Sequence, residues 1–199
     1  MNERATRLLI VLAAFLAGLV LCFTVVLIAT GRGPSLLAST SASVGGPFRL
    51  TDQNGKTITD QDLKGRPSII FFGFTHCPEV CPTALFDISE VLNRLGPDAS
   101  KVNALFITVD PERDTPAVLK DYLSSFNPRL VGVGGDADAL AAVAKAYRVY
   151  YKKVPTQDGD YTMDHTAIVY LMDKNGQFVA PFSLKRKPEE AAAELRRYL

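Results

Sequence analysis

An uncharged stretch over residues 8–30, LLIVLAAFLAGLVLCFTVVLIAT, constrains the fold of this chain more than any other feature. As a helix, its 23 residues would extend about 35 Å, enough to cross the hydrocarbon core of a bilayer, which is about 30 Å thick. A cleaved signal peptide usually has a shorter apolar region, about 7–15 residues long. We therefore predict a single N-terminal transmembrane helix over residues 8–30.

Basic residues are placed asymmetrically around this apolar stretch. Arg4 and Arg7 precede it, whereas Arg32 alone follows it closely. The positive-inside rule assigns the more basic flank to the cytoplasm, so residues 1–7 are predicted to be cytoplasmic. The chain is then expected to cross the cytoplasmic (inner) membrane once, with its globular domain on the periplasmic or equivalent outer side.

The rest of the chain divides into a linker and one domain. Residues 31–46 are rich in Gly, Ser, Ala and Thr, the composition of a flexible tether, and residues 47–199 have the length of one globular domain. The net charge is only +1, and no cluster of Lys and Arg is interleaved with aromatic residues. The chain therefore lacks the electrostatic signature of a nucleic-acid-binding protein, and nucleic acid is not an expected partner.

Strand and helix patterns alternate along the predicted domain. Residues 67–74, PSIIFFGF, form an unbroken apolar run, typical of a central strand covered on both faces. The Asn54-Gly55 pair predicts an N-terminal hairpin with a type I′ turn, in which both residues have positive φ. The order of elements predicts an α/β fold, a mixed sheet flanked by helices. The other predicted elements are helices over 82–95, 116–125, 137–147 and 188–198, strands over 102–109 and 130–133, and a hairpin of strands 166–172 and 177–180.

Two cysteines lie four residues apart directly after the apolar strand. Cys77 and Cys81 are each followed by a proline, and because a residue before proline is disfavoured in the α region, both are expected in a turn that enters the helix at Pro82. Their sulfur atoms would then lie near a helix N-terminus, where the macrodipole favours thiolate. Such a pair suits a structural disulfide, a redox pair or a metal site, and the spacing alone does not choose between them.

A single histidine far along the chain favours the metal site. His165 precedes the predicted strand 166–172 and follows the loop 158–160, and in the predicted topology this end of the strand can approach the cysteine turn. Two soft thiolates and one imidazole form a low-coordinate site that suits copper(I), whereas zinc normally takes a fourth ligand. We predict Cys77, Cys81 and His165 as copper ligands, with copper(I) favoured and copper(II) as the alternative oxidation state.

Three further residues are candidates for the surroundings of this site. Asp164 could orient the imidazole or guide a cation. His76 adjoins Cys77 and could lower the pKa of its thiol, although successive side chains point in different directions from an extended backbone. Asp110 follows a strand at the edge where α/β proteins place functional loops, although a turn with a helix cap explains this segment as well.

Five short segments stand out when the folded part of the chain is considered as a whole. They are GFTHCPEVCP at 73–82, VDPERDTP at 109–116, YRVYY at 147–151, DHT at 164–166 and KRK at 185–187. In this order they resemble the Sco/SenC family of copper-binding assembly factors. Glu79 is a departure, because the family more often has Asp there, but the change is conservative and lies outside the predicted ligands.

The resemblance implies more than the residues alone. It implies a thioredoxin-like fold, a copper site whose ligands map onto Cys77, Cys81 and His165, and a role in assembling the dinuclear copper centre of cytochrome c oxidase subunit II. The expected partners are subunit II itself and a copper donor protein.

Two functions fit this site. A metallochaperone would hold copper through reduced thiols and pass it on by ligand exchange, and a Cys77–Cys81 disulfide would remove two of its three ligands. A membrane-tethered thiol-disulfide reductase would instead use the same pair to reduce the cysteines of a target. The three-residue spacing and the lack of a proline between Pro155 and Pro181 argue against a general reductase of the thioredoxin kind. A peroxidase-like enzyme would need an isolated nucleophilic cysteine, and none is obvious.

Overall fold

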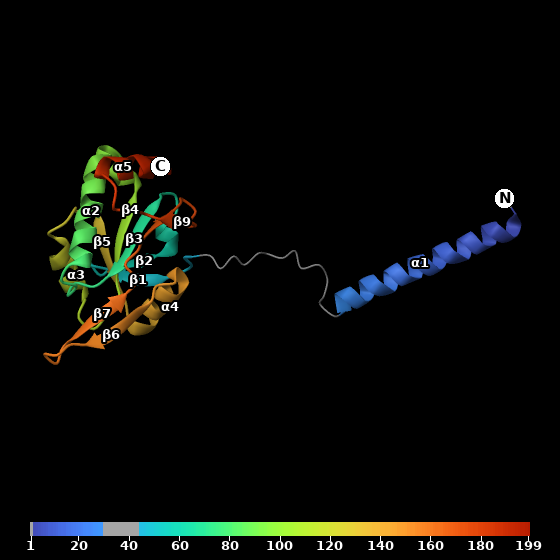
Figure 1. The fold of residues 1–199 in the computed structure, drawn as a ribbon, viewed down its shortest axis with the longest axis horizontal. Coiled ribbons are helices and arrows are strands. Elements are labelled where there is room, and N and C mark those ends of the chain that lie inside the picture. The colour runs from blue at the N-terminus through green and yellow to red at the C-terminus, as the bar shows by residue number, and fades with distance from the viewer. Residues whose placement is uncertain (1, 30–43) are drawn as a thin grey trace. The chain divides into compact units, whose positions relative to one another are not determined.

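The computed structural model describes residues 2–29 and 44–199, drawn as the coloured ribbon in Figure 1. The chain divides into two compact units, Met1–Ala42 and Ser43–Leu199, which are described separately. Residues 30–43, which include most of the predicted linker, lie outside the described residues.

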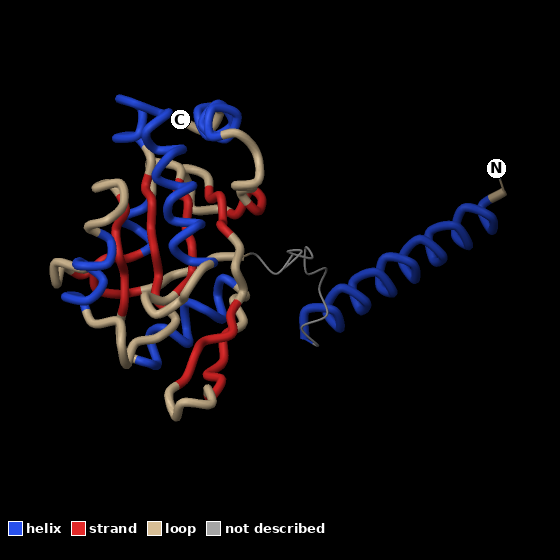
Figure 2. The backbone as a smooth tube through the Cα atoms, turned by 60° about the vertical axis from the view of Figure 1, so that its left-hand side comes forward, coloured by secondary structure: helices blue, strands red, loops and turns tan. Residues whose placement is uncertain are grey.

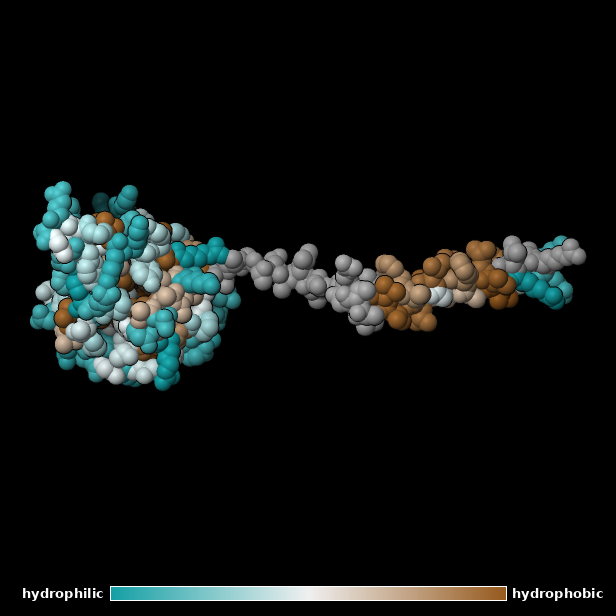
Figure 3. All heavy atoms as spheres, turned by 90° about the horizontal axis from the view of Figure 1, so that it is seen from below, coloured by the Kyte–Doolittle hydropathy of each residue, from teal (hydrophilic) through white to brown (hydrophobic). Residues whose placement is uncertain are grey.

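The N-terminal unit contains one long helix, α1 (Glu3–Ala29). Its most apolar part, Leu9–Val26, has a mean hydropathy of 2.9, and its apolar surface is coloured brown in Figure 3. A helix that is apolar on all sides is stable when lipid or protein surrounds it. By length and composition α1 is able to cross a membrane. Thr30, the last residue of the predicted span, lies outside the described residues.

A seven-stranded mixed sheet forms the centre of the second unit, with strand order β2-β1-β5-β4-β3-β8-β9. The central strands β3, β4 and β5 are parallel, whereas β1, β2, β8 and β9 pair antiparallel with their neighbours. All six residues of β3 are buried, as predicted for a central strand. The strands are β1 (Arg49–Asp52), β2 (Thr57–Thr59), β3 (Ser68–Gly73), β4 (Asn103–Thr108), β5 (Leu130–Gly134), β8 (Val169–Met172) and β9 (Phe178–Pro181).

Helices cover both faces of this sheet (Figure 2), which confirms the predicted architecture. Neighbouring residues of β3 point to opposite faces. On one face Phe106 packs against both Phe71 and Tyr122 of α3, and on the other Phe72 packs against Tyr147 of α4. The helices are α2 (Val80–Leu95), α3 (Pro116–Leu123), α4 (Ala137–Tyr147) and α5 (Pro188–Arg196), with 3₁₀ helices η1 (Asp60–Leu63) and η2 (Gly96–Lys101).

A separate two-stranded ribbon, absent from the predicted elements, extends from the body of the domain in Figure 1. It consists of β6 (Tyr151–Pro155) and β7 (Tyr161–His165), paired antiparallel. The strand that was predicted over 166–172 starts only at Val169. His165 therefore ends a strand of the ribbon instead of preceding a strand of the main sheet.

The N-terminal hairpin is present, but its turn differs from the predicted type. Gly55 has a φ of 82°, whereas Asn54 is not among the residues with positive φ, so the predicted type I′ turn is wrong. The Asp52 carboxylate accepts hydrogen bonds from the N–H groups of Asn54 and Lys56. These bonds stabilise a turn in which glycine alone takes the left-handed conformation.

The folded unit starts before the predicted boundary at residue 47. Gly45 donates its N–H to the carbonyl oxygen of Ala146 at 2.9 Å, and Val44 packs against the hydrophobic core. Composition alone assigned both residues to the linker, but these contacts make them part of the domain.

We expect Gly73→Ala to destabilise the domain and to displace Cys81. A Cβ at position 73 would lie 2.6 Å from Phe106 Cε2 and 2.8 Å from Cys81 Sγ, so the neighbouring atoms would have to move. The free energy of unfolding should fall by about 1–3 kcal/mol, as measured by urea denaturation of the full chain in detergent. Gly46→Ala is the matched control, because its Cβ would meet Ala146 Cβ at 3.4 Å. Equal losses in the two variants would contradict the close packing of Cys81 on Gly73.

Candidate metal centre

The two cysteines lie on the segment that joins the buried strand β3 to helix α2. Cys81 is the second residue of α2, which begins at Val80 instead of the predicted Pro82, and Cys77 lies in the preceding turn. Cys81 donates its backbone N–H to Cys77 Sγ at 3.3 Å, and both cysteines are free thiols. Both side chains therefore lie at the N-terminus of α2, with Cys81 inside its first turn.

The imidazole of His165 reaches this pair from the end of β7. Its Nε2 lies 3.7 Å from Cys81 Sγ, although the two residues are 84 positions apart in the sequence. Its Nδ1 lies 3.1 Å from the carbonyl oxygen of Thr166, and because a carbonyl only accepts hydrogen bonds, Nδ1 carries the proton. In this tautomer the lone pair of Nε2 faces Cys81, where it can accept the thiol hydrogen or bind a metal ion.

Aromatic packing fixes and desolvates the imidazole. The rings of Phe71 and Phe74 pack on His165 in T-shaped contacts, with centroid separations of 6.4 Å and 5.8 Å. Burial lowers the pKa of His165 below its usual value, against the opposing effects of the Thr166 carbonyl and the Asp164 charge. At neutral pH the ring is therefore an uncharged donor, the form in which histidine binds metals.

Cys81 is held in an apolar environment. Its exposed fraction is 0%, and its Sγ lies over Gly73, a residue without a side chain. Burial raises the pKa of Cys81 far above its usual value, with smaller contributions from Cys77 and the charge of Asp114. The thiolate expected from the position at a helix N-terminus is thus not favoured at Cys81, because burial disfavours its charged form. A proton must leave Cys81 when its sulfur binds a cation or enters a disulfide.

A buried carboxylate outside the predicted set holds the start of the cysteine segment. The two oxygen atoms of Asp114 accept hydrogen bonds from the N–H of Thr75 at 3.0 Å, from its hydroxyl at 2.6 Å, and from the hydroxyl of Thr108 at 2.6 Å. Burial raises the pKa of Asp114. From the sequence either Asp114 or Thr115 could cap the helix that begins at Pro116, and in the structure Thr115 caps α3 by accepting a hydrogen bond from the N–H of Val118.

Asp164 and His76 lie beside the donor atoms and not among them. Asp164 is exposed, and no hydrogen bond joins it to His165 among the described residues. The Thr166 carbonyl performs the orienting role that was expected of Asp164, because the side chain of a residue next to His165 in the strand points to the other face. His76 is also exposed, and its Nδ1 lies 3.1 Å from Thr75 Oγ1.

Asp110 lies on the turn that follows β4 and is completely buried. Its Oδ2 accepts a hydrogen bond from Arg113 Nε at 2.6 Å, and its Oδ1 accepts one from the hydroxyl of Tyr161 at 2.8 Å. Asp110 is therefore bonded to the ribbon that carries His165. Both oxygen atoms of its carboxylate are already occupied by these bonds.

Cys81 Sγ and His165 Nε2 are in contact, but Cys77 Sγ does not join them in a group of three donor atoms. In the described parts of the chain, no three His, Cys, Asp or Glu side chains are grouped so that they could hold a metal ion as they stand. Cys77 is half-buried, and its Sγ accepts a hydrogen bond from the backbone N–H of Cys81. A three-donor site would be completed by a change in the Cys77 side chain, since packing fixes the other two.

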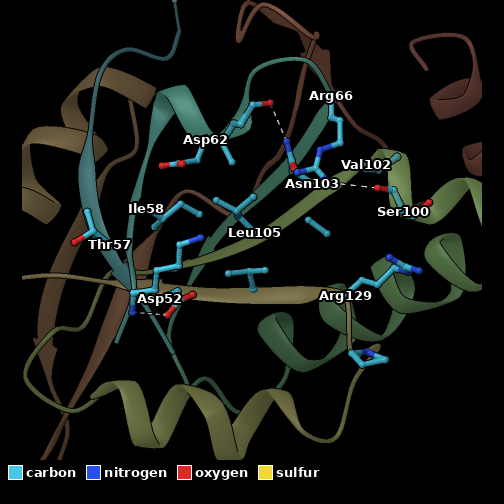
Figure 4. Close-up of a pocket in the computed structure, with 15 residues that line it drawn as sticks. Asp52, Thr57, Ile58, Asp62, Arg66, Ser100, Val102, Asn103, Leu105 and Arg129 are labelled. Atoms are coloured by element: carbon cyan, nitrogen blue, oxygen red, sulfur yellow. Dashed lines mark hydrogen bonds between the residues drawn. The ribbon is translucent and has the colours of Figure 1, made fainter. Parts of the chain in front are cut away.

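A cavity of about 480 Å³ lies at the other end of the sheet (Figure 4). Asn103 and Leu105, at the start of β4, line it together with Arg66 and Arg129. Because β3 and β4 are parallel and in register, these residues lie at the end opposite to Gly73 and the cysteine segment. The cavity is therefore not part of the candidate metal centre.

Comparison with known proteins assigns the chain to a family. A sequence model of the SCO1/SenC family matches residues 38–199. The chain belongs to the SCO1/SenC family. One relative, a SCO2-like protein from Rickettsia felis, is 40% identical over 152 residues, which make up 75% of this chain and 74% of that protein.

Solved Sco structures share the fold described above. ScoI from Bradyrhizobium japonicum, solved with copper bound, is 69% identical and has a TM-score of 0.78, over 79% of this chain and 100% of that chain. Yeast Sco1, also solved with copper bound, is 40% identical and has a TM-score of 0.72, over 78% of this chain and 88% of that chain. The predicted thioredoxin-like fold of the SCO1/SenC family is thereby confirmed.

Proposed function

We propose that this SCO1/SenC protein is a copper metallochaperone. It would carry copper(I) on Cys77, Cys81 and His165 and deliver it to the dinuclear copper centre of cytochrome c oxidase subunit II. The observation that carries the proposal is the contact of 3.7 Å between Cys81 Sγ and His165 Nε2. Similarity to two Sco proteins whose structures contain copper supports it.

The separation of these two atoms suits a shared ion. With a metal–sulfur distance of about 2.3 Å and a metal–nitrogen distance of about 2.0 Å, two donors at a trigonal angle lie about 3.7 Å apart. The observed separation of 3.7 Å therefore leaves room for one ion between Cys81 and His165 without a rearrangement of either. Rotation of the half-buried Cys77 would supply the third donor.

The donor chemistry favours copper(I) over harder ions. Thiolates select soft ions such as copper(I), and a neutral imidazole suits copper in both oxidation states; copper(II) is the second candidate. Cys81 is buried, whereas Cys77 is partly accessible. An incoming thiolate of the target would therefore displace Cys77 first, and copper would leave by stepwise ligand exchange.

The apolar helix α1 would keep this site near its membrane-bound target. We propose that residues 8–30 anchor the chain in the cytoplasmic membrane, with residues 1–7 in the cytoplasm and the globular domain on the outer side. Arg4 and Arg7 support this orientation. A copper donor protein on the same side would load the site.

The candidate ligand His165 can be tested against the neighbouring histidine. We expect His165→Ala to weaken copper(I) binding by about 10-fold or more, because loss of an outer partner of a ligand already costs about 10–100-fold. His76→Ala is the control, since His76 is exposed and bonded to Thr75, and should bind like the parent. The measurement is copper retained by the reduced full chain after dialysis against a copper chelator. Equal retention by the parent and His165→Ala would refute the proposed ligand set.

A second candidate function, thiol-disulfide reduction, is favoured by the two adjacent free thiols. In that reaction the thiols of Cys77 and Cys81 would give two electrons and two protons to a target disulfide. The target would gain two thiols, and a Cys77–Cys81 disulfide would form.

The two functions differ in turnover. Metal-free protein can be incubated with a disulfide-bonded peptide that contains the copper-binding cysteines of the target, together with an external electron donor. The chaperone proposal predicts at most one disulfide reduced for each protein molecule. Many turnovers, abolished by Cys77→Ser, would show instead that the protein is a reductase.

A further inference from the structure

The two halves of the metal centre come from distant segments, and one short turn contacts both. We propose that the turn over residues 110–114 sets the distance between the cysteines and His165, with Asp110, Arg113 and Tyr161 acting as positioning residues for the imidazole. This inference rests on the copper site proposed above. We refer to Asp110, Arg113 and Tyr161 together as the clasp.

The clasp is a closed network of polar contacts. Asp110 accepts one hydrogen bond from Arg113 Nε at 2.6 Å and another from the Tyr161 hydroxyl at 2.8 Å. Arg113 in turn donates from Nη1 to the carbonyl oxygen of Tyr161 at 2.9 Å. The guanidinium also stacks on the Tyr161 ring, with Cζ 3.7 Å from the ring centroid. Each of the three residues therefore contacts both of the others.

Burial makes this network rigid. The Asp110 side chain is 0% exposed and the Arg113 side chain 16% exposed. A buried charge pair is costly to separate, because either partner alone would be left desolvated and unpaired. Separating Asp110 from Arg113 would leave a buried charge without its partner. The cost of that state keeps β7 in contact with the turn.

The clasp acts at the strand that carries the imidazole. Tyr161 and His165 are the first and last residues of β7, and their spacing of four places them on the same face of the strand. β7 forms no strand pairing with the main sheet and pairs only with β6 among the described strands. It contacts the body of the domain through side chains instead, with Met163 7% exposed and His165 packed on Phe71, and a two-stranded ribbon alone is marginally stable. The clasp therefore supplies a fixed point from which the strand projects His165 toward Cys81.

The other end of the same turn holds the cysteine segment. Asp114 donates its N–H to the carbonyl oxygen of Asp110 at 3.0 Å, and its carboxylate accepts both hydrogen bonds from Thr75. Thr75 is two residues before Cys77. Turn residues 110–114 thus connect the cysteine half of the site to the histidine half through hydrogen bonds at both ends.

A double-mutant cycle tests whether the clasp acts through His165. Tyr161→Phe removes one hydrogen bond but keeps the ring, and Arg113→Lys keeps the charge but loses the fork-shaped contact. Each should weaken copper(I) binding by about 10-fold, measured on the reduced full chain by competition with a coloured copper(I) chelator. In the His165→Ala background neither should have a further effect, because there is no imidazole left to position.

Tyr150→Phe is the matched control, since Tyr150 lies next to the ribbon and is 55% exposed, and it should bind like the parent. If Tyr161→Phe does not fold, Arg113→Lys alone provides the same comparison. No loss of affinity in either clasp variant, or the same loss with and without His165, would overturn the positioning role. If His165→Ala itself binds like the parent, the copper site fails, and that result is distinct from a failure of the clasp alone.

Discussion

The contact between a buried thiol and a neutral imidazole requires the domain to hold two distant segments in fixed positions. Cys81 and His165 meet at 3.7 Å although one belongs to a helix packed on the main sheet and the other to a separate ribbon. Two donors can share an ion only when their positions are fixed closely. The glycine under Cys81 and the aromatic rings around His165 provide that fixation.

Burial gives the metal-free pair a neutral resting state. Desolvation raises the pKa of Cys81 and lowers the pKa of His165, so both groups are uncharged at neutral pH. Neither then bears the cost of a buried, unpaired charge. A soft cation that enters would displace the thiol proton and replace it as the partner of both atoms.

Much of the fold follows from local sequence patterns. The run PSIIFFGF predicts the buried strand β3, and the two Cys-Pro pairs predict a helix start within two residues of the observed one. The tyrosines and basic residues around Tyr151 are compatible with an amphipathic strand, but four of the five β6 residues are exposed, and no local pattern predicts the pairing of this strand with β7. The role of Asp114 was missed because its partner Thr75 is 39 positions away, and no local pattern reports such a contact. The Asn54-Gly55 turn type was wrong because the Asp52 carboxylate bonds the turn backbone directly.

In the proposed site, one copper ion is bound by two sulfur atoms and one imidazole nitrogen of this chain. X-ray absorption spectroscopy of the reduced full chain, loaded with one equivalent of copper(I), reports these neighbours. We expect two sulfur scatterers at about 2.3 Å and one nitrogen scatterer at about 2.0 Å, with the outer-shell pattern of an imidazole. A copper ion with sulfur neighbours alone, or with no imidazole signal, would rule out the proposed ligand set.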